Sequence, residues 1–261
     1  VREGDWLPAV VFFVVASVAA EAANVFYDSL LPHVAGPDEM DRVSARGFAL
    51  GYLGGGLLLL VNLLWYMKPE WFGFRDGSVA IRASFLSVAV WWAVFALPLF
   101  RHVPEPPLAA GGQRQASPAE AVRAAFQRLG RTFREIRRYK ELFKYLVAFW
   151  LYADGIGTIM KMATIYGAEI GIGTADLAGA LLLTQVVGVP FTFLFGALPD
   201  RIGTKRSIYI SLAVYAFISV VAYWMTEPWQ FWVLAGLVGT VQGGSQALSR
   251  SLFGAMCPKS R

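Results

Sequence analysis

The sequence has few of the side chains from which metal centres and enzyme active sites are built. It contains one cysteine, Cys257, and two histidines, His33 and His102. One cysteine excludes a disulfide within the chain, and so few nitrogen and sulfur ligands exclude a zinc cluster. The sequence also lacks a serine–histidine–aspartate set and a phosphate-binding glycine loop. We therefore predict no metal, no cofactor and no enzymatic activity.

Charge is also scarce. Only 16% of the 261 residues are charged, whereas 56% are hydrophobic, and a soluble domain is about a quarter charged. The net charge of +5 raises the question of a nucleic-acid partner. However, the cations border apolar runs and do not form a patch interleaved with aromatic residues. These features predict a protein whose first partner is the lipid bilayer and which binds no nucleic acid.

Long apolar runs fill most of the chain. A helix of about 20 residues crosses a hydrocarbon core about 30 Å thick, and no run shows the sustained alternation of a strand. The sequence therefore predicts an all-α membrane protein, a polytopic bundle of about seven transmembrane helices. The expected spans are residues 6–31, 47–67, 83–100, 145–166, 177–198, 207–225 and 229–256.

The cations are divided unequally between the two sets of alternate loops. Seventeen of the 23 lysines and arginines lie in one set, four in the other and two inside spans. Cytoplasmic loops carry the excess of cations in membrane proteins. We expect an integral protein of a bacterial inner (plasma) membrane, with the N-terminus of this chain outside and its C-terminus in the cytoplasm.

A cytoplasmic segment, residues 101–144, separates three spans (residues 1–100) from four (residues 145–261). Its first part, residues 102–118, is rich in proline, glycine and alanine and is predicted to be a flexible linker. A basic amphipathic helix follows, with arginines on its other faces. Its apolar positions are Val122, Phe126, Leu129, Phe133, Ile136 and Phe143. We expect this helix on the inner leaflet, where it either anchors the protein or docks a regulatory partner.

The loop between the fifth and sixth spans carries the most specific motif. It reads Gly196-Ala-Leu-Pro-Asp200-Arg201-Ile-Gly203-Thr-Lys205-Arg206. Gly203 permits a tight turn, and Asp200 can accept from backbone N–H groups or pair with an arginine. The pattern resembles the cytoplasmic-loop signature of the major facilitator superfamily of transporters. The resemblance implies that this is a gating loop and that Asp200 and Arg201 do not bind the solute.

Three more segments are similar to the vacuole effluxer-like branch of that superfamily: residues 26–32 (FYDSLLP), 44–56 (SARGFALGYLGGG) and 152–158 (YADGIGT). The resemblance implies two six-helix halves joined by a cytoplasmic loop and moving by alternating access. The seven spans would correspond to helices four to ten of twelve, a partial fold that is not expected to transport alone. Fungal members of the branch imply efflux of amino acids.

Polar residues inside the expected spans are the candidate solute or proton sites, because ionisable groups in hydrocarbon are costly. In the first span, Glu21 and Asn24 share a face with Asp28. Glu21 is either a transport-site or proton-carrying carboxylate or a structural hydrogen-bonding group. Asp28 lies nearer the cytoplasmic end, and we expect it to be a solvated end residue.

The fourth span carries Asp154, Thr158 and Lys161 on nearly one face. Asp154 suits a substrate ammonium group or a proton; alternatively, it locks the conformation by pairing with Lys161 or Glu21.

In the last span, Gln242, Gln246 and Arg250 recur every four residues. The amides suit a polar solute. Arg250 either binds a carboxylate or phosphate or, as we expect, contacts another helix or lipid headgroups.

These observations favour a secondary active transporter of a small polar or amphipathic solute, with coupling to protons left open. The alternative is a channel or a non-transporting membrane receptor or structural protein. A transporter gives saturable, gradient-coupled flux, whereas a channel gives conductance that does not saturate.

Overall fold

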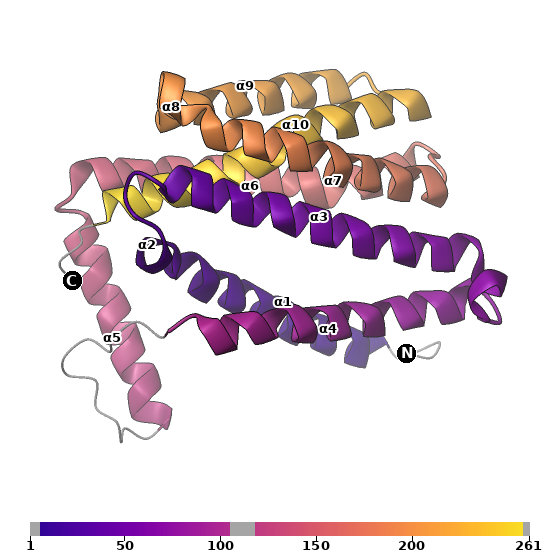
Figure 1. Ribbon diagram of the computed structural model, residues 1–261, viewed down its shortest axis with the longest axis horizontal. Coiled ribbons are helices and arrows are strands. Elements are labelled where there is room, and N and C mark those ends of the chain that lie inside the picture. The colour runs from indigo at the N-terminus through magenta and orange to yellow at the C-terminus, as the bar shows by residue number, and fades with distance from the viewer. Residues whose placement is uncertain (1–5, 105–117, 258–261) are drawn as a thin grey trace.

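The computed structural model describes residues 6–104 and 118–257, and all regular structure in these ranges is helical (Figure 1). Eight helices are long: α1 (Trp6–Ser29), α3 (Met40–Met67), α4 (Gly77–His102), α5 (Pro118–Ile136), α6 (Lys140–Glu169), α7 (Thr174–Ala197), α9 (Thr204–Ala222) and α10 (Pro228–Met256). Three single turns complete the described chain: α2 (Leu31–Val34), the 3₁₀ turn η1 (Pro69–Phe72) and α8 (Pro199–Ile202). The all-α fold expected from the sequence is confirmed.

Among the described residues, six helical segments are long and apolar enough to cross a membrane, one fewer than the expected seven. They are α1 with α2, α3, α4, α6, α7 with α8, and α9. The seventh expected span forms α10, whose 29 residues include Gln242, Gln246 and several serines. Twelve of its residues, Gln242 among them, are buried. Several of its polar side chains are therefore buried against other helices. This environment allows α10 to be more polar than the six other segments.

The long helices run along the longest axis of the molecule, apart from α5 (Figure 1). Helix α10 packs against α7, α9 and α3, and α3 also packs along α7. The core formed there includes Leu248, Phe195 and Tyr215. By contrast, α1 buries no residue and α4 buries only Ala80. The packed part of the bundle is thus formed by α3, α7, α9 and α10, with one face of α6 packed against it through Ile156.

Helices α10, α7 and α3 meet at a glycine. A Cβ atom on Gly243 would collide with Thr192 Oγ1 of α7 and would lie 2.7 Å from Cε2 of Tyr52 on α3. No larger residue fits at this crossing, because packed interiors leave no free space for a methyl group.

Helix α4 begins with a side-chain cap. The Asp76 carboxylate accepts hydrogen bonds from the backbone N–H groups of Ser78 (2.8 Å) and Val79 (3.0 Å) and from the Ser78 hydroxyl (2.6 Å). These bonds stabilise the charged form, so they lower the pKa of the Asp76 carboxyl below its usual value.

Helix α5 runs across the spans at one end of the bundle (Figure 1). It ends at Ile136, and α6 begins at Lys140. The amphipathic helix is therefore shorter than expected, because Phe143 belongs to α6. Helix α4 continues to His102. Residues 105–117, which make up most of the predicted linker, lie outside the described residues.

Candidate functional site

A set of polar contacts joins α1 and α3 to α8, α9 and α10 at one end of the bundle; we call it the end seam. At its centre, Arg250 of α10 donates to Asp28 Oδ1 of α1 at 3.1 Å. Arg250 also donates to Oγ (3.0 Å) and to the backbone oxygen (3.2 Å) of Ser44 on α3. The Arg250 side chain is only 8% exposed, whereas that of Asp28 is 49% exposed. Asp28 is therefore a paired residue as well as a partly solvated one.

Two aromatic rings enclose the Arg250 guanidinium. Its central carbon lies 5.0 Å from the ring centre of Tyr27 and 4.7 Å from that of Phe48. A guanidinium can stack on rings while it donates in its own plane, which a lysine cannot do. The buried charge is thus compensated by an anion, two oxygens and two rings. Of the roles considered for Arg250, the structure shows the contact with other helices.

Asp41 holds the second part of the end seam. It lies in the first turn of α3, where a carboxylate is favoured by the helix dipole. Its Oδ2 accepts from the Thr204 hydroxyl of α9 at 2.8 Å, and its Oδ1 accepts from the Ser251 hydroxyl of α10. The Ser44 hydroxyl donates to the backbone oxygen of Ala247 at 2.7 Å. One end of α3 is therefore tied to both α9 and α10.

The third part is an ion pair between Arg42 of α3 and Asp200 of the motif loop, at 2.5 Å. Both side chains are more than half exposed, at 58% and 51%. Asp200 thus pairs with an arginine from a distant helix instead of capping a helix. Beside it, a Cβ on Gly196 would lie 2.5 Å from the Ala45 Cβ. Gly203 has φ +85°, a left-handed value, and ends α8 directly before α9.

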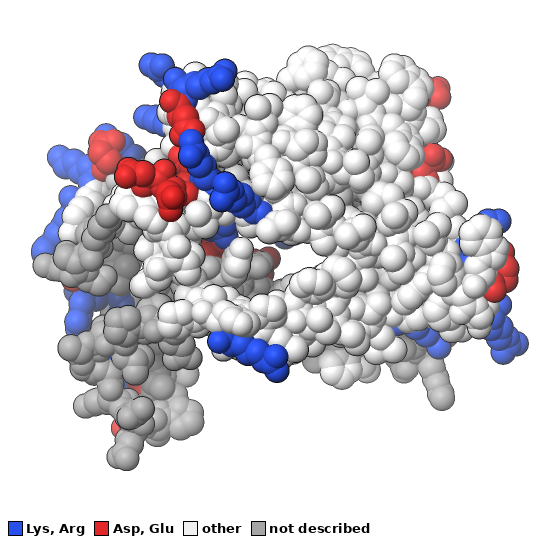
Figure 2. Space-filling model, viewed as in Figure 1, with Lys and Arg blue, Asp and Glu red and all other residues white. Residues whose placement is uncertain are grey.

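The three cations of the motif loop face outward. Arg201, Lys205 and Arg206 are exposed, and none of them forms an ion pair within the described residues. Lys205 lies over the Tyr209 ring, 5.8 Å from its centre. Figure 2 shows the larger group of lysines and arginines at the end of the molecule that carries α8 and α5, a smaller group at the opposite end, and a largely uncharged surface between them.

A tyrosine from α3 lies between the same helices deeper in the bundle. The Tyr52 hydroxyl donates to Oε1 of Gln246 at 3.0 Å. Its ring packs against Gly188 of α7 and Gly243 of α10. Gln242, one turn before Gln246, is buried beside it. The two candidate glutamines thus contact or adjoin one side chain of α3.

The other candidate solute residues are not brought together. Glu21 and Asn24 are exposed on α1, and neither forms a hydrogen bond or ion pair within the described residues. Asp154, Thr158 and Lys161 are likewise exposed on α6 and unpaired in that part of the chain. The proposed lock from Asp154 to Lys161 or Glu21 is absent there.

Helix α6 packs through its other face. The hydroxyls of Tyr145 and Tyr152 bond at 2.7 Å to the backbone oxygen and the hydroxyl of Ser249 on α10, respectively. This contact leaves the face with Asp154 uncovered. Among the described residues, no three histidine, cysteine, aspartate or glutamate side chains are grouped so that they could hold a metal ion.

Sequence reasoning did not identify Asp41, Arg42, Ser44 or Tyr52. Ser44 and Tyr52 lie inside the segment 44–56 that supports the family resemblance, which was the available signal. Their partners are about 200 residues away along the chain. A pairing of that kind leaves no local pattern in one sequence.

Comparison with known proteins identifies a matching family and several relatives of this chain. A family model described as "Vacuole effluxer Atg22 like" matches residues 1–261. The chain is 39% identical over 257 residues to the "Uncharacterized MFS-type transporter YxiO" of Bacillus subtilis (strain 168), covering 97% of this chain and 58% of that protein. It is 28% identical over 249 residues to "Autophagy-related protein 22" of Yarrowia lipolytica, covering 84% and 41%. The chain thus spans about half the length of these relatives. No solved structure matches it.

Proposed function

This chain belongs to the vacuole effluxer Atg22-like family, and we propose that it supplies the middle of a secondary active transporter whose two halves meet at the end seam. The family consists of transporters and is not a class of enzymes. In this proposal, residues 1–100 end the first half, residues 101–144 link the halves, and residues 145–261 begin the second half. The transported solute is small and polar or amphipathic.

The observation that carries the proposal is the chemistry of the end seam. It joins α1 and α3 to α8, α9 and α10 through hydroxyl, carboxylate and guanidinium groups. The buried contacts contribute about 1–3 kcal/mol each, and the exposed ion pair contributes little, because water replaces each contact when it breaks. A polar contact of this kind can open and reform, as a gate must, whereas an apolar core would resist separation.

The end seam lies at the cytoplasmic end in this proposal. The motif loop, the start of α3, the end of α10 and α5 are at the same end of the bundle (Figures 1 and 2). The set of alternate loops to which the motif loop and α5 belong carries 17 of the 23 lysines and arginines, and such loops face the cytoplasm. The described conformation is then the one closed to the cytoplasm.

In this proposal the solute site lies deeper, on the faces of α1, α6 and α10 that carry polar residues, although the described conformation does not bring these faces together. The carboxylates of Glu21 and Asp154 have no partner within the described residues, so each is available for an ammonium group or a proton. Gln242 and Gln246 supply amide groups for a carboxylate or a hydroxyl. Asn24, Thr158 and Lys161 are the neighbours of these groups. An amino acid, which carries both charges, fits this set best.

Flux of labelled amino acids into vesicles tests the site, in a transport-competent protein that carries this chain. Glu21→Gln and Asp154→Asn should each lower saturable flux at least about tenfold, which corresponds to about 1.4 kcal/mol of lost interaction. The matched control is Glu169→Gln, because Glu169 is also exposed on α6 but lies in its last turn. Flux that is insensitive to both site changes would remove the assignment, and flux that does not saturate would favour a channel.

Proton coupling needs a separate measurement. If Glu21 carries the proton, Glu21→Gln abolishes uptake driven by a pH gradient but leaves exchange of labelled for unlabelled solute at equal pH. Loss of both activities would make Glu21 a solute ligand, and loss of neither would exclude it from coupling.

A further inference from the structure

Helix α5 exposes a continuous apolar face. Val122, Phe126, Leu129 and Phe133 recur at intervals of three and four residues, which puts them on one side of the helix. The four residues are 55–69% exposed. Two exposed phenylalanines and a leucine on a helix in water are unfavourable by about 25 cal/mol for each Å² of apolar surface. Something therefore covers this face in the functional protein.

The opposite sides of α5 are strongly basic. Arg123, Arg128, Arg131 and Arg134 lie away from the apolar face. Within the described residues, none of the four forms an ion pair. Arg137, just beyond the helix, lies over the Phe133 ring at 4.8 Å from its centre. Unpaired cations beside an exposed apolar face favour a partner that is anionic and also has an apolar region.

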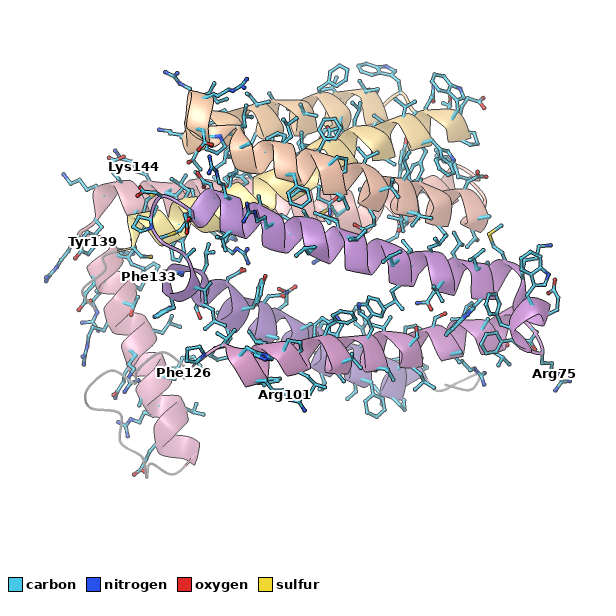
Figure 3. All side chains as sticks on the ribbon, viewed as in Figure 1. Arg75, Arg101, Phe126, Phe133, Tyr139 and Lys144 are labelled. Atoms are coloured by element: carbon cyan, nitrogen blue, oxygen red, sulfur yellow. The ribbon has the colours of Figure 1, made fainter. Side chains whose placement is uncertain are left out.

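The position of α5 narrows the choice of partner. The helix lies at the end of the bundle that carries the motif loop and runs across the spans (Figure 1). Figure 3 shows Phe126 and Phe133 on the side of α5 that is turned toward the spans. If the spans cross a bilayer, this orientation points the apolar face into the membrane and leaves the arginines at the level of the headgroups.

We propose that α5 binds the anionic phospholipids of the leaflet that surrounds the end seam. The phenyl and leucyl groups enter the boundary between headgroups and acyl chains, and the arginines contact lipid phosphates. An anionic phospholipid offers a negative headgroup to the basic side of the helix and acyl chains to its apolar side. A neutral lipid offers only the acyl chains. The inference does not rest on transport, since its measurement needs only the chain in a bilayer.

The contribution of the arginine charges to membrane binding can be expressed as a change in the ratio of bound to free helix. One arginine near an anionic surface changes the ratio of bound to free helix about fivefold. Neutralising Arg128 and Arg131 together should therefore lower that ratio about 25-fold. The matched variant Arg128→Lys/Arg131→Lys keeps both charges and should retain most of the binding.

The experiment uses the whole chain in nanodiscs, with Cys257 replaced by serine. A polarity-sensitive fluorophore is attached at Leu129→Cys on the apolar face or, as a control, at Gln127→Cys on the basic side. Discs contain phosphatidylcholine alone or phosphatidylcholine with phosphatidylglycerol. The readout is quenching of the fluorophore by lipids that carry a nitroxide near the headgroup.

The proposal predicts that phosphatidylglycerol increases quenching at Leu129→Cys much more than at Gln127→Cys. Arg128→Gln/Arg131→Gln should abolish the increase, and the lysine variant should preserve it. The same charge loss outside α5, in Arg201→Gln/Arg206→Gln, should leave it intact. A label at position 129 that stays in water in both discs would overturn the proposal and indicate a protein partner. Equal quenching in both discs, insensitive to the arginines, would also overturn it.

Discussion

Arg250 is the residue on which the end seam depends most, and Arg250→Gln should open it. The substitution removes the ion pair to Asp28 and at least one of the two bonds to Ser44. Hydrogen bonds to a charged group are worth about 1.5–3 kcal/mol each. The pair to Asp28 is worth less than about 1 kcal/mol, because that carboxylate is half exposed. We expect a total loss of about 3 kcal/mol, or roughly a hundredfold change in the ratio of closed to open molecules.

The assay is a distance measurement between two spin labels. With Cys257 replaced, labels at Glu39→Cys and Ala197→Cys report on the exposed ends of α3 and α7. The unaltered end seam should give one short distance, and Arg250→Gln should add a populated longer distance.

Arg206→Gln is the control, since it removes the same charge from an exposed residue without an ion pair in the described chain. An unchanged distance distribution in Arg250→Gln, with the helical content preserved, would refute the reasoning from burial and bonding at this residue.

Three further predictions concern stability. Gly243→Ala should cost about 1–3 kcal/mol by overpacking, seen as a lower thermal midpoint in detergent. Gly155→Ala, inside α6 and with no atom near its Cβ, should not lower the midpoint and should raise it slightly, because alanine is favoured over glycine in a helix by about 0.5–1 kcal/mol. A double-mutant cycle on Arg42 and Asp200 should give a small coupling that disappears at high salt, because both side chains are exposed. The lowered pKa of Asp76 stabilises the start of α4 above about pH 4, and this is lost as the pH falls through the lowered value. Asp76→Asn keeps a side-chain oxygen that can cap the helix but loses the titrating carboxyl. The thermal midpoint of this variant should therefore fall less steeply as the pH is lowered below about 4.

Much of the fold followed from the hydrophobic runs, because a bilayer forces each backbone polar group into a helix. The ends were less accurate: α3 begins at Met40, seven residues before the predicted span. A helix does not stop where hydrocarbon stops, and Asp41 and Arg42 continue it into the polar boundary. The polar composition of α10 reflects neighbours that no single sequence identifies.

The candidate site was predictable only in part. The motif loop was recognised by its resemblance to the superfamily signature, which one contiguous stretch of sequence carries. The pairing of Arg250 with Asp28 spans 222 residues along the chain, and only the packing of α1 and α3 against α10 brings them together. Glu21 and Asp154 were selected for the cost of burying charge, yet their faces are exposed. Their roles therefore remain a prediction for the flux experiments.

Reversible locking of the end seam tests the central claim most directly. Asp41→Cys/Ser251→Cys, with Cys257 replaced, puts two thiols where side chains of α3 and α10 are already bonded. In a transport-competent protein that carries this chain, oxidation should stop flux and a reductant should restore it, while each single cysteine variant should be insensitive to both. A fully cross-linked protein that transports at the unoxidised rate would contradict the claim that this end opens during transport.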